Sequence, residues 1–185
     1  QHTENGLFTQ AMAILNRCPE EMRNWEWGYV MRLANRDKMA LSVGSEASFG
    51  MAVSDDRRLA ATSSHEGFVK VWNLETGEVL HRLDGSRKRS VALDFSPDNR
   101  LLASGSEVTI RLWDLKTGEI TSVLSGHSKE LNGIDFSPDG TRLVSGADDG
   151  MAIIWDLQTE ERVLTLTGDA TGVSNVTFLA GGRQV

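Results

Sequence analysis

Short apolar runs separated by turn-forming residues make up most of the chain from about residue 45 onward. Runs such as Leu101 to Ser104 and Ile120 to Leu124 span only four or five residues and are bounded by Gly, Pro, Asp, Asn or Ser. Runs of this length with such boundaries are typical of β-strands, whereas an amphipathic helix needs a longer apolar stripe. The pattern therefore predicts a mainly β fold for this part of the chain.

The strand pattern repeats around three tryptophans. Trp72, Trp113 and Trp155 each stand in an apolar hexapeptide followed by a turn, and they are separated by 41 and 42 residues. Each copy contains three further short strands, and the first strand of a fourth copy is expected from Val173 to Phe178. Four short strands in a period of about 40 residues are typical of one antiparallel blade in a repeat protein.

The first 38 residues follow a different pattern. Phe8, Met12 and Leu15 have helical spacing, and a second helix is predicted from Cys18-Pro19-Glu20-Glu21 to about Asn35, with Pro and acidic residues in its first turn. We therefore expect a helical segment over residues 1–38 and a repeat domain over residues 39–185.

The repeats resemble those of the WD-repeat β-propeller family. The third copy opens with Gly126-His127, has turns at Ser137-Pro138-Asp139-Gly140 and Asp148-Asp149-Gly150, and closes with Trp155-Asp156. The resemblance implies an incomplete β-propeller with three full four-stranded blades and the start of a fourth. The expected blades are residues 45–84, 85–125 and 126–167, followed by the incomplete 168–185.

The same resemblance implies a hydrogen-bonded tetrad inside a blade. The four residues are His127, Ser145, Asp149 and Trp155 in the third copy. The first two copies match only in part, through Thr62, Glu66 and Trp72, and through Ser104 and Trp113. Because Trp113 lacks the His and Asp partners, we predict that the second blade is the least stable of the three, as measured by amide hydrogen exchange.

Two sets of residues have the types found in catalytic sites. Ser145, His127 and Asp149 have the residue types of a hydrolase triad, but Ser145 lies in a predicted strand and not on an exposed Gly-x-Ser-x-Gly elbow. Asp94 and Asp135 near the ends of the innermost strands are candidate acid–base residues. As equivalent positions of adjacent repeats, they fit a structural role better, so we expect no enzymatic activity in this chain.

The extent of the repeats indicates a fragment. Propellers typically close with four to eight blades, and three blades with the start of a fourth cannot close a ring. We expect the chain to be part of a longer protein; a half-propeller that closes by dimerisation is the alternative. Uncovered terminal blades expose apolar faces and strand edges, so the chain expressed alone should aggregate or be only marginally folded.

The helical segment adds a narrower resemblance. Residues 15–33, with Cys18-Pro19 and Trp25-Glu26-Trp27, are similar to the segment before the WD repeats in large bacterial proteins, many of which carry a serine/threonine protein kinase domain. The 185 residues contain no glycine-rich phosphate loop, His-Arg-Asp loop or Asp-Phe-Gly motif. Any kinase domain would therefore lie outside this chain.

Composition narrows the classes of ligand. The 19 basic and 26 acidic residues give a net charge of −7, which disfavours nucleic acid binding. One cysteine and four scattered histidines show no metal-ligand spacing, so we expect no metal and no cofactor. A protein or peptide partner is expected instead. The candidate partner-binding rim comprises His65, Arg87, Lys88, Arg89, Lys129 and Asp148, although a solvated loop is the simpler interpretation of the basic run.

These observations predict a protein–protein interaction scaffold that holds loops on a rigid frame. The alternative is a sensing or substrate-recruiting region of a bacterial serine/threonine kinase. No run of 18 apolar residues is present, so the expected location is cytoplasmic, with membrane tethering through a missing region as the alternative.

Overall fold

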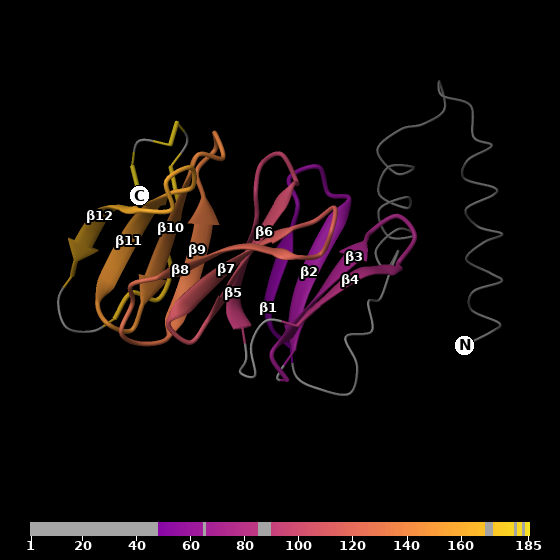
Figure 1. The fold of residues 1–185 in the computed structure, drawn as a ribbon, viewed down its shortest axis with the longest axis horizontal. Coiled ribbons are helices and arrows are strands. Elements are labelled where there is room, and N and C mark those ends of the chain that lie inside the picture. The colour runs from indigo at the N-terminus through magenta and orange to yellow at the C-terminus, as the bar shows by residue number, and fades with distance from the viewer. Residues whose placement is uncertain (1–47, 65, 85–89, 169–171, 180, 183) are drawn as a thin grey trace, which may run out of the picture. The chain divides into compact units, whose positions relative to one another are not determined.

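The computed structural model describes residues 48–64, 66–84, 90–168, 172–179, 181–182 and 184–185. These residues form three four-stranded antiparallel sheets, in the order β1-β2-β3-β4, β5-β6-β7-β8 and β9-β10-β11-β12. We call them blade 1, blade 2 and blade 3 (Figure 1). The strands are β1 (Ser48–Val53), β2 (Leu59–Ser64), β3 (Phe68–Asn73), β4 (Val79–Asp84), β5 (Ser90–Phe95), β6 (Leu101–Ser106), β7 (Thr109–Asp114), β8 (Ile120–Ser125), β9 (Leu131–Phe136), β10 (Arg142–Ala147), β11 (Met151–Asp156) and β12 (Arg162–Thr167).

The prediction of three four-stranded antiparallel sheets is confirmed. The predicted helices and the predicted boundary at residue 38 lie outside the described residues.

A buried serine and an aspartate two residues later fix the turn between the first two strands of each blade. In blade 3 the Ser137 hydroxyl donates to the Asp139 carboxylate at 2.6 Å and accepts from the backbone N–H of Arg142 at 2.9 Å. Ser54 with Asp56, and Ser96 with Asp98, form the same donor–acceptor pairs. The repeated Ser-x-Asp pattern therefore sets the spacing between the two innermost strands of every blade.

The last residue of each tryptophan strand caps the turn that follows it. The Asp114 carboxylate accepts from the backbone N–H groups of Lys116 at 2.7 Å and Thr117 at 3.0 Å. Asn73 and Asp156 occupy the equivalent positions and make equivalent bonds. An Asp or Asn after the tryptophan thus has a local structural role in positioning the outermost strand.

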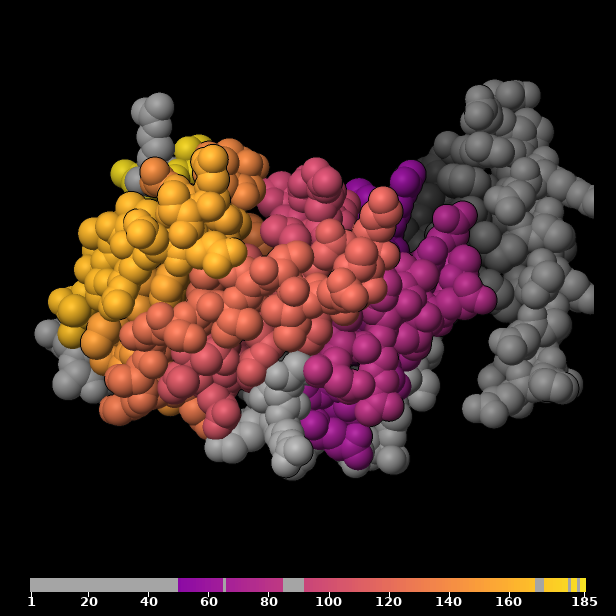
Figure 2. All heavy atoms as spheres, in the orientation of Figure 1, coloured from indigo at the N-terminus to yellow at the C-terminus, as the bar shows by residue number. Residues whose placement is uncertain are grey.

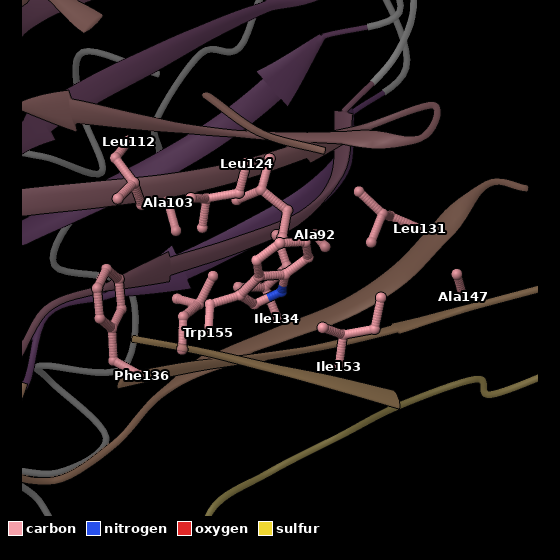
Figure 3. Packing of buried hydrophobic residues seen from close by; sticks show 12 residues of the cluster. Ala92, Ala103, Leu112, Leu124, Leu131, Ile134, Phe136, Ala147, Ile153 and Trp155 are labelled. Carbon is pink, nitrogen blue, oxygen red and sulfur yellow. The ribbon is translucent and has the colours of Figure 1, made fainter. Parts of the chain in front are cut away.

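The blades pack face to face through the tryptophans. Trp113 of blade 2 packs in one cluster with Val71 and Leu83 of blade 1. Trp155 of blade 3 packs in a second cluster with Leu112 and Leu124 of blade 2. Figure 3 shows the Trp155 indole among the labelled side chains of this second cluster. Blades 2 and 3 therefore each present their tryptophan face to the preceding blade, and in Figure 2 the atoms of blade 2 fill the space between the other two.

The predicted strand from Val173 to Phe178 is not assigned as a strand. These residues are extended along blade 3, where the Val173 N–H donates to the Ala147 carbonyl at 2.8 Å. A strand requires a ladder of hydrogen bonds to a neighbouring strand, and no described residue supplies that ladder on this segment. The structure therefore corrects the sequence prediction at this point.

Candidate functional site

The four tetrad residues of blade 3 come together in one hydrogen-bonded chain. His127 Nδ1 lies 3.0 Å from Asp149 Oδ2, and its Nε2 lies 2.8 Å from the Ser145 hydroxyl. The Trp155 indole N–H donates to the same hydroxyl at 2.9 Å. Because a carboxylate only accepts, Nδ1–H donates to Asp149; in the neutral ring Nε2 then accepts the Ser145 proton. Every polar atom of this buried chain thus has a partner.

The tetrad also joins two loops at the same end of blade 3. His127 precedes β9, whereas Asp149 lies in the turn between β10 and β11. The Asp149 carboxylate additionally accepts from the backbone N–H of Ser128 at 2.8 Å and of Met151 at 3.1 Å. Burial alone would raise the pKa of Asp149, but these hydrogen bonds and His127 outweigh it and lower the pKa. Asp149 therefore stays ionised at neutral pH and holds the two loops together.

Within the described residues, blades 1 and 2 contain only the tryptophan end of this hydrogen-bonded chain. The Trp72 indole donates to the Thr62 hydroxyl at 2.8 Å, and the Trp113 indole donates to the Ser104 hydroxyl at 2.8 Å. Glu66 is exposed in its turn and forms no hydrogen bond to a described residue. The described part of blade 1 therefore gives Glu66 no role equivalent to that of Asp149.

Blade 2 contains a polar network that the sequence analysis missed. The Arg111 guanidinium donates to the Ser106 hydroxyl at 3.0 Å and to the Thr109 hydroxyl at 3.2 Å. Ser106 and Thr109 pair directly across a two-residue turn in which Glu107 has a φ of 52°. The turn is one residue shorter than in blade 3, and that shorter turn was the available signal for a different arrangement.

Two of the predicted rim residues lie together on blade 3. Lys129 and Asp148 are both exposed, and their loops are joined by a bond from the Asp148 N–H to the Glu130 carbonyl at 2.9 Å. The Asp148 carboxylate accepts from the Asn132 side chain at 2.6 Å, which fixes its position. His65, Arg87, Lys88 and Arg89 lie outside the described residues.

The two inner-strand carboxylates bind the backbone of the following segment. Asp94 Oδ2 accepts from the Phe136 N–H at 2.7 Å, and Asp135 Oδ2 accepts from the Phe178 N–H at 2.6 Å. Both residues line a hollow of about 210 Å³ together with Asp55. Burial raises the pKa of Asp94 to about 7, with a further contribution from the Asp135 charge. Their shared geometry supports a structural role between neighbouring inner segments.

The three repeats match the model of a known protein family. The family model for the WD domain, G-beta repeat, matches residues 43–73, 77–114 and 118–156, which together exceed half of the chain. The chain belongs to the WD40 family. The second and third matches begin just before the outermost strand of one blade and end with the tryptophan strand of the next, so the WD40 repeat is offset from the blade by about one strand.

Individual relatives match parts of this WD40 chain. The WD repeat-containing protein SL1-17 of Schistosoma mansoni is 44% identical over 48 residues, which are 26% of this chain and 16% of that protein. The crystal structure of the RRP9 WD40 repeats has a TM-score of 0.71 at 21% identity and covers 75% of this chain. The structure of U3-55K gives a TM-score of 0.71 at 20% identity and the same coverage. This chain spans 44% and 45% of those two structures, and the similarity to them shows the fold alone.

The WD40 tetrad has distances that would suit a hydrolase triad. The Ser145–His127 and His127–Asp149 separations both fall within hydrogen-bond range. The Ser145 side chain, however, is 0% exposed, and its oxygen already accepts from the Trp155 indole. A nucleophile must reach a substrate, so Ser145 in this conformation cannot act as one. WD40 domains are typically non-catalytic and generally serve as protein-interaction scaffolds.

No cluster of three or more His, Cys, Asp and Glu residues with metal-binding geometry occurs in the described ranges. Within the same ranges, no helix is long and apolar enough to cross a membrane.

Proposed function

We propose that this WD40 chain is a non-catalytic scaffold that binds a protein or peptide partner on the rim of its blades. The observation that carries the proposal is the way the blade 3 tetrad fixes two rim loops. The buried His127–Asp149 pair and the Ser128 N–H bond hold the loop that carries Lys129 against the turn that carries Asp148. Side chains that are already ordered lose less entropy when a partner binds.

The rim has charge of both signs in the same small area. Lys129 and Asp148 are exposed above a tetrad whose His127 and Asp149 side chains are only 1% and 3% exposed. Loops held by a rigid framework are where binding residues usually occur. The predicted basic residues Arg87, Lys88 and Arg89, with His65, are proposed to extend the same rim.

A quantitative affinity purification tests the rim assignment. Tagged wild-type chain is compared with Lys129→Glu/Asp148→Lys, which exchanges one base and one acid on the rim. Arg142→Glu/Glu161→Lys is the matched control, because both of these residues are exposed at the opposite ends of the blade 3 strands. We expect a stoichiometric partner with wild type and control, and its loss with the rim variant. Equal recovery with all three chains would refute the rim assignment.

A second candidate function rests on the amino-terminal segment. Cys18-Pro19 and Trp25-Glu26-Trp27 resemble the segment that precedes WD repeats in bacterial proteins with serine/threonine kinase domains. We propose, as the alternative, that the chain is a sensing or substrate-recruiting region of such a bacterial kinase. Sequencing the gene outward from both ends of the chain tests this, since a kinase domain upstream would support it and its absence would remove it.

For localisation we propose the cytoplasm, with membrane tethering through another part of the protein as the alternative. Fractionation of cells that carry a tagged chromosomal copy separates these two locations. Recovery in the soluble fraction supports the first, and recovery with membranes supports the second.

A further inference from the structure

A hollow lies at the junction of blades 1 and 2, at the ends of the strands opposite to the rim. Its volume is about 320 Å³, and it is lined by Leu59 of blade 1 and by Asn99, Arg100, Asp114, Leu115 and Lys116 of blade 2. This volume is at the lower end of the range for ligand pockets, about 300–1,000 Å³. The hollow is therefore large enough for one bulky side chain of a bound segment.

The lining combines an apolar floor with a cationic edge. Leu59 and Leu115 are half-buried and pack against the core cluster shared by the two blades. Arg100 and Lys116 are exposed and form no ion pair with a described residue. The Asp114 carboxylate is already bound to the backbone N–H groups of Lys116 and Thr117. Arg100 and Lys116 therefore face solvent beside an apolar surface, with the Asp114 carboxylate near both of them.

Asn99 adds an unused acceptor to this lining. Its side-chain oxygen is buried and has no hydrogen-bond donor among the residues that the structure describes. Buried polar atoms are nearly always paired, so an unpaired one needs a physical explanation. Asn99 has a φ of 56° in the turn before β6, which fixes its place at the edge of the hollow. If the Asn99 side chain turns toward the hollow, a donor from a bound segment would satisfy this oxygen.

The junction of blades 2 and 3 provides an internal comparison. Thr141 and Gln158 occupy the positions of Arg100 and Lys116, and Gly140 replaces Asn99. The first junction has in addition a hydrogen bond from His81 of blade 1 to the Leu115 carbonyl at 2.8 Å, which holds one wall of the hollow. Ser122 occupies the position of His81 in blade 2, and its hydroxyl forms no hydrogen bond to a described residue. The cationic edge, the acceptor and the fixed wall thus occur together at the first junction.

We propose that the hollow between blades 1 and 2 binds an extended acidic segment of a partner protein, with one large apolar side chain inserted between Leu59 and Leu115. Acidic residues flanking that side chain pair with Arg100 and Lys116, and an N–H of the segment donates to Asn99. This proposal rests on the scaffold function and names a second site on it, with its own ligand chemistry. It does not depend on the rim residues.

Peptide selection tests the proposal without knowledge of the partner. A phage-displayed library of random 12-residue peptides is selected on the immobilised full chain, and enriched peptides are measured by fluorescence polarisation. We expect enriched peptides to share a large apolar residue flanked by Asp or Glu. Arg100→Thr/Lys116→Gln, which installs the blade 3 residues, should weaken their binding by about tenfold, as expected for the loss of two exposed charge pairs.

The matched control is Arg57→Asn/Arg58→Thr. It also removes two positive charges on the same side of the blades, but neither residue lines the hollow. We expect less than about a twofold change with this control, because exposed charges outside a contact are largely screened. An equal loss with both double variants, no loss with Arg100→Thr/Lys116→Gln, or enrichment of no acidic apolar peptide would each overturn the proposal.

The rim variant separates this proposal from the scaffold function. If Lys129→Glu/Asp148→Lys abolishes peptide binding and the hollow variant does not, the peptides bind at the rim and the hollow is excluded. If only Arg100→Thr/Lys116→Gln abolishes peptide binding, and Lys129→Glu/Asp148→Lys leaves the recovery of the partner unchanged, the binding site in the hollow is supported and the rim assignment is refuted. Far-ultraviolet circular dichroism of each variant confirms that it is folded.

Discussion

At the scale of single residues, contact between neighbouring blades depends on positions without a side chain. Gly105 in β6 faces the inner strand of blade 3, and a Cβ placed on it would lie 2.7 Å from Ile134 Cδ1. Gly146 in β10 has the equivalent position, where a Cβ would lie 2.9 Å from Val176 Cγ1. Both glycines thus leave room for an apolar side chain of the following segment.

Gly105→Ala should therefore destabilise the chain by about 1–3 kcal/mol through overpacking. Ile134→Val removes the clashing Cδ1 atom, so the double variant should recover part of the loss, with a coupling free energy of at least about 0.5 kcal/mol. Urea unfolding of wild type, Gly105→Ala, Ile134→Val and the double variant measures this coupling free energy. Strictly additive effects would show that the two residues do not meet as described.

Asp94 is a residue whose ionisation opposes folding. Burial raises its pKa to about 7 from an ordinary value near 3.8, while Asp55 and Asp135 add repulsion and the Phe136 N–H partly offsets these effects. A folded-state pKa above the unfolded value means that the folded chain binds the proton more tightly. The contribution of Asp94 to stability is then present below about pH 4 and is lost as the pH rises to about 7.

Asp94→Asn should remove this pH dependence. The amide oxygen can still accept from the Phe136 N–H, but it carries no charge at any of these pH values. Since Asp94 is half-buried and partly solvated, we expect the variant to be more stable than wild type by about 1–2 kcal/mol at pH 8 and equally stable near pH 4. Denaturant unfolding at several pH values gives the difference, and a constant difference across them would contradict the assignment.

At the scale of elements, local periodicity decides which features the sequence could predict. Strand positions and the indole bonds of Trp72, Trp113 and Trp155 follow from local periodicity, because paired residues lie within about one hairpin of each other. The hydrogen bond from the Phe136 N–H to the Asp94 carboxylate joins residues 42 apart on different blades. Such a contact depends on how blades stack, which the alternation of apolar residues does not encode.

The Arg111 network and the hollow between blades 1 and 2 were missed for different reasons. The network follows from a turn one residue shorter than that of blade 3, which changes which side chains face each other across the hairpin. The hollow requires Leu59 and Lys116 to meet across a blade junction. The sequence shows that Arg100 and Lys116 are charged, but not that they border one apolar surface.

The packing also bears on the relative stability of the blades. The sequence predicts that blade 2 opens first because Trp113 lacks a His and an Asp partner. The structure adds an opposing factor, since blade 2 is covered on both faces and Leu124 in β8 is only 2% exposed. The equivalent residue of β12, Leu166, is 42% exposed.

Hydrogen exchange of the chain decides between these factors. Burial of one leucine contributes about 1.5–3 kcal/mol, so amides of β12 should exchange at least about tenfold faster than those of β8. Mass spectrometry after peptic digestion resolves the two strands. Faster exchange in β8 than in β12 would instead favour the missing His and Asp as the dominant effect.

At the scale of the whole molecule, the two faces of blade 3 differ in how far the described residues cover them. The faces between blades 1, 2 and 3 are filled by Trp113 and Trp155, whereas the far face of blade 3 carries Leu164 and Leu166 at 46% and 42% exposure. These leucines pair across the sheet with the apolar residues Ile154 and Ala152. They therefore form an exposed apolar surface of the kind that promotes self-association.

Replacing these two leucines should improve solubility without unfolding the chain. Leu164→Lys/Leu166→Glu leaves the net charge unchanged and places polar groups where the side chains already meet solvent. We expect a larger monomer fraction in sedimentation velocity and a midpoint of thermal unfolding within a few degrees of wild type, as for most surface substitutions.

Leu124→Glu is the matched comparison, because it changes the residue equivalent to Leu166 where blade 3 covers it. Burying that carboxylate should cost about 3 kcal/mol or more. If Leu164→Lys/Leu166→Glu destabilises the chain as much as Leu124→Glu does, the far face of blade 3 is buried in solution by some other part of the molecule. Self-association through this face is then excluded.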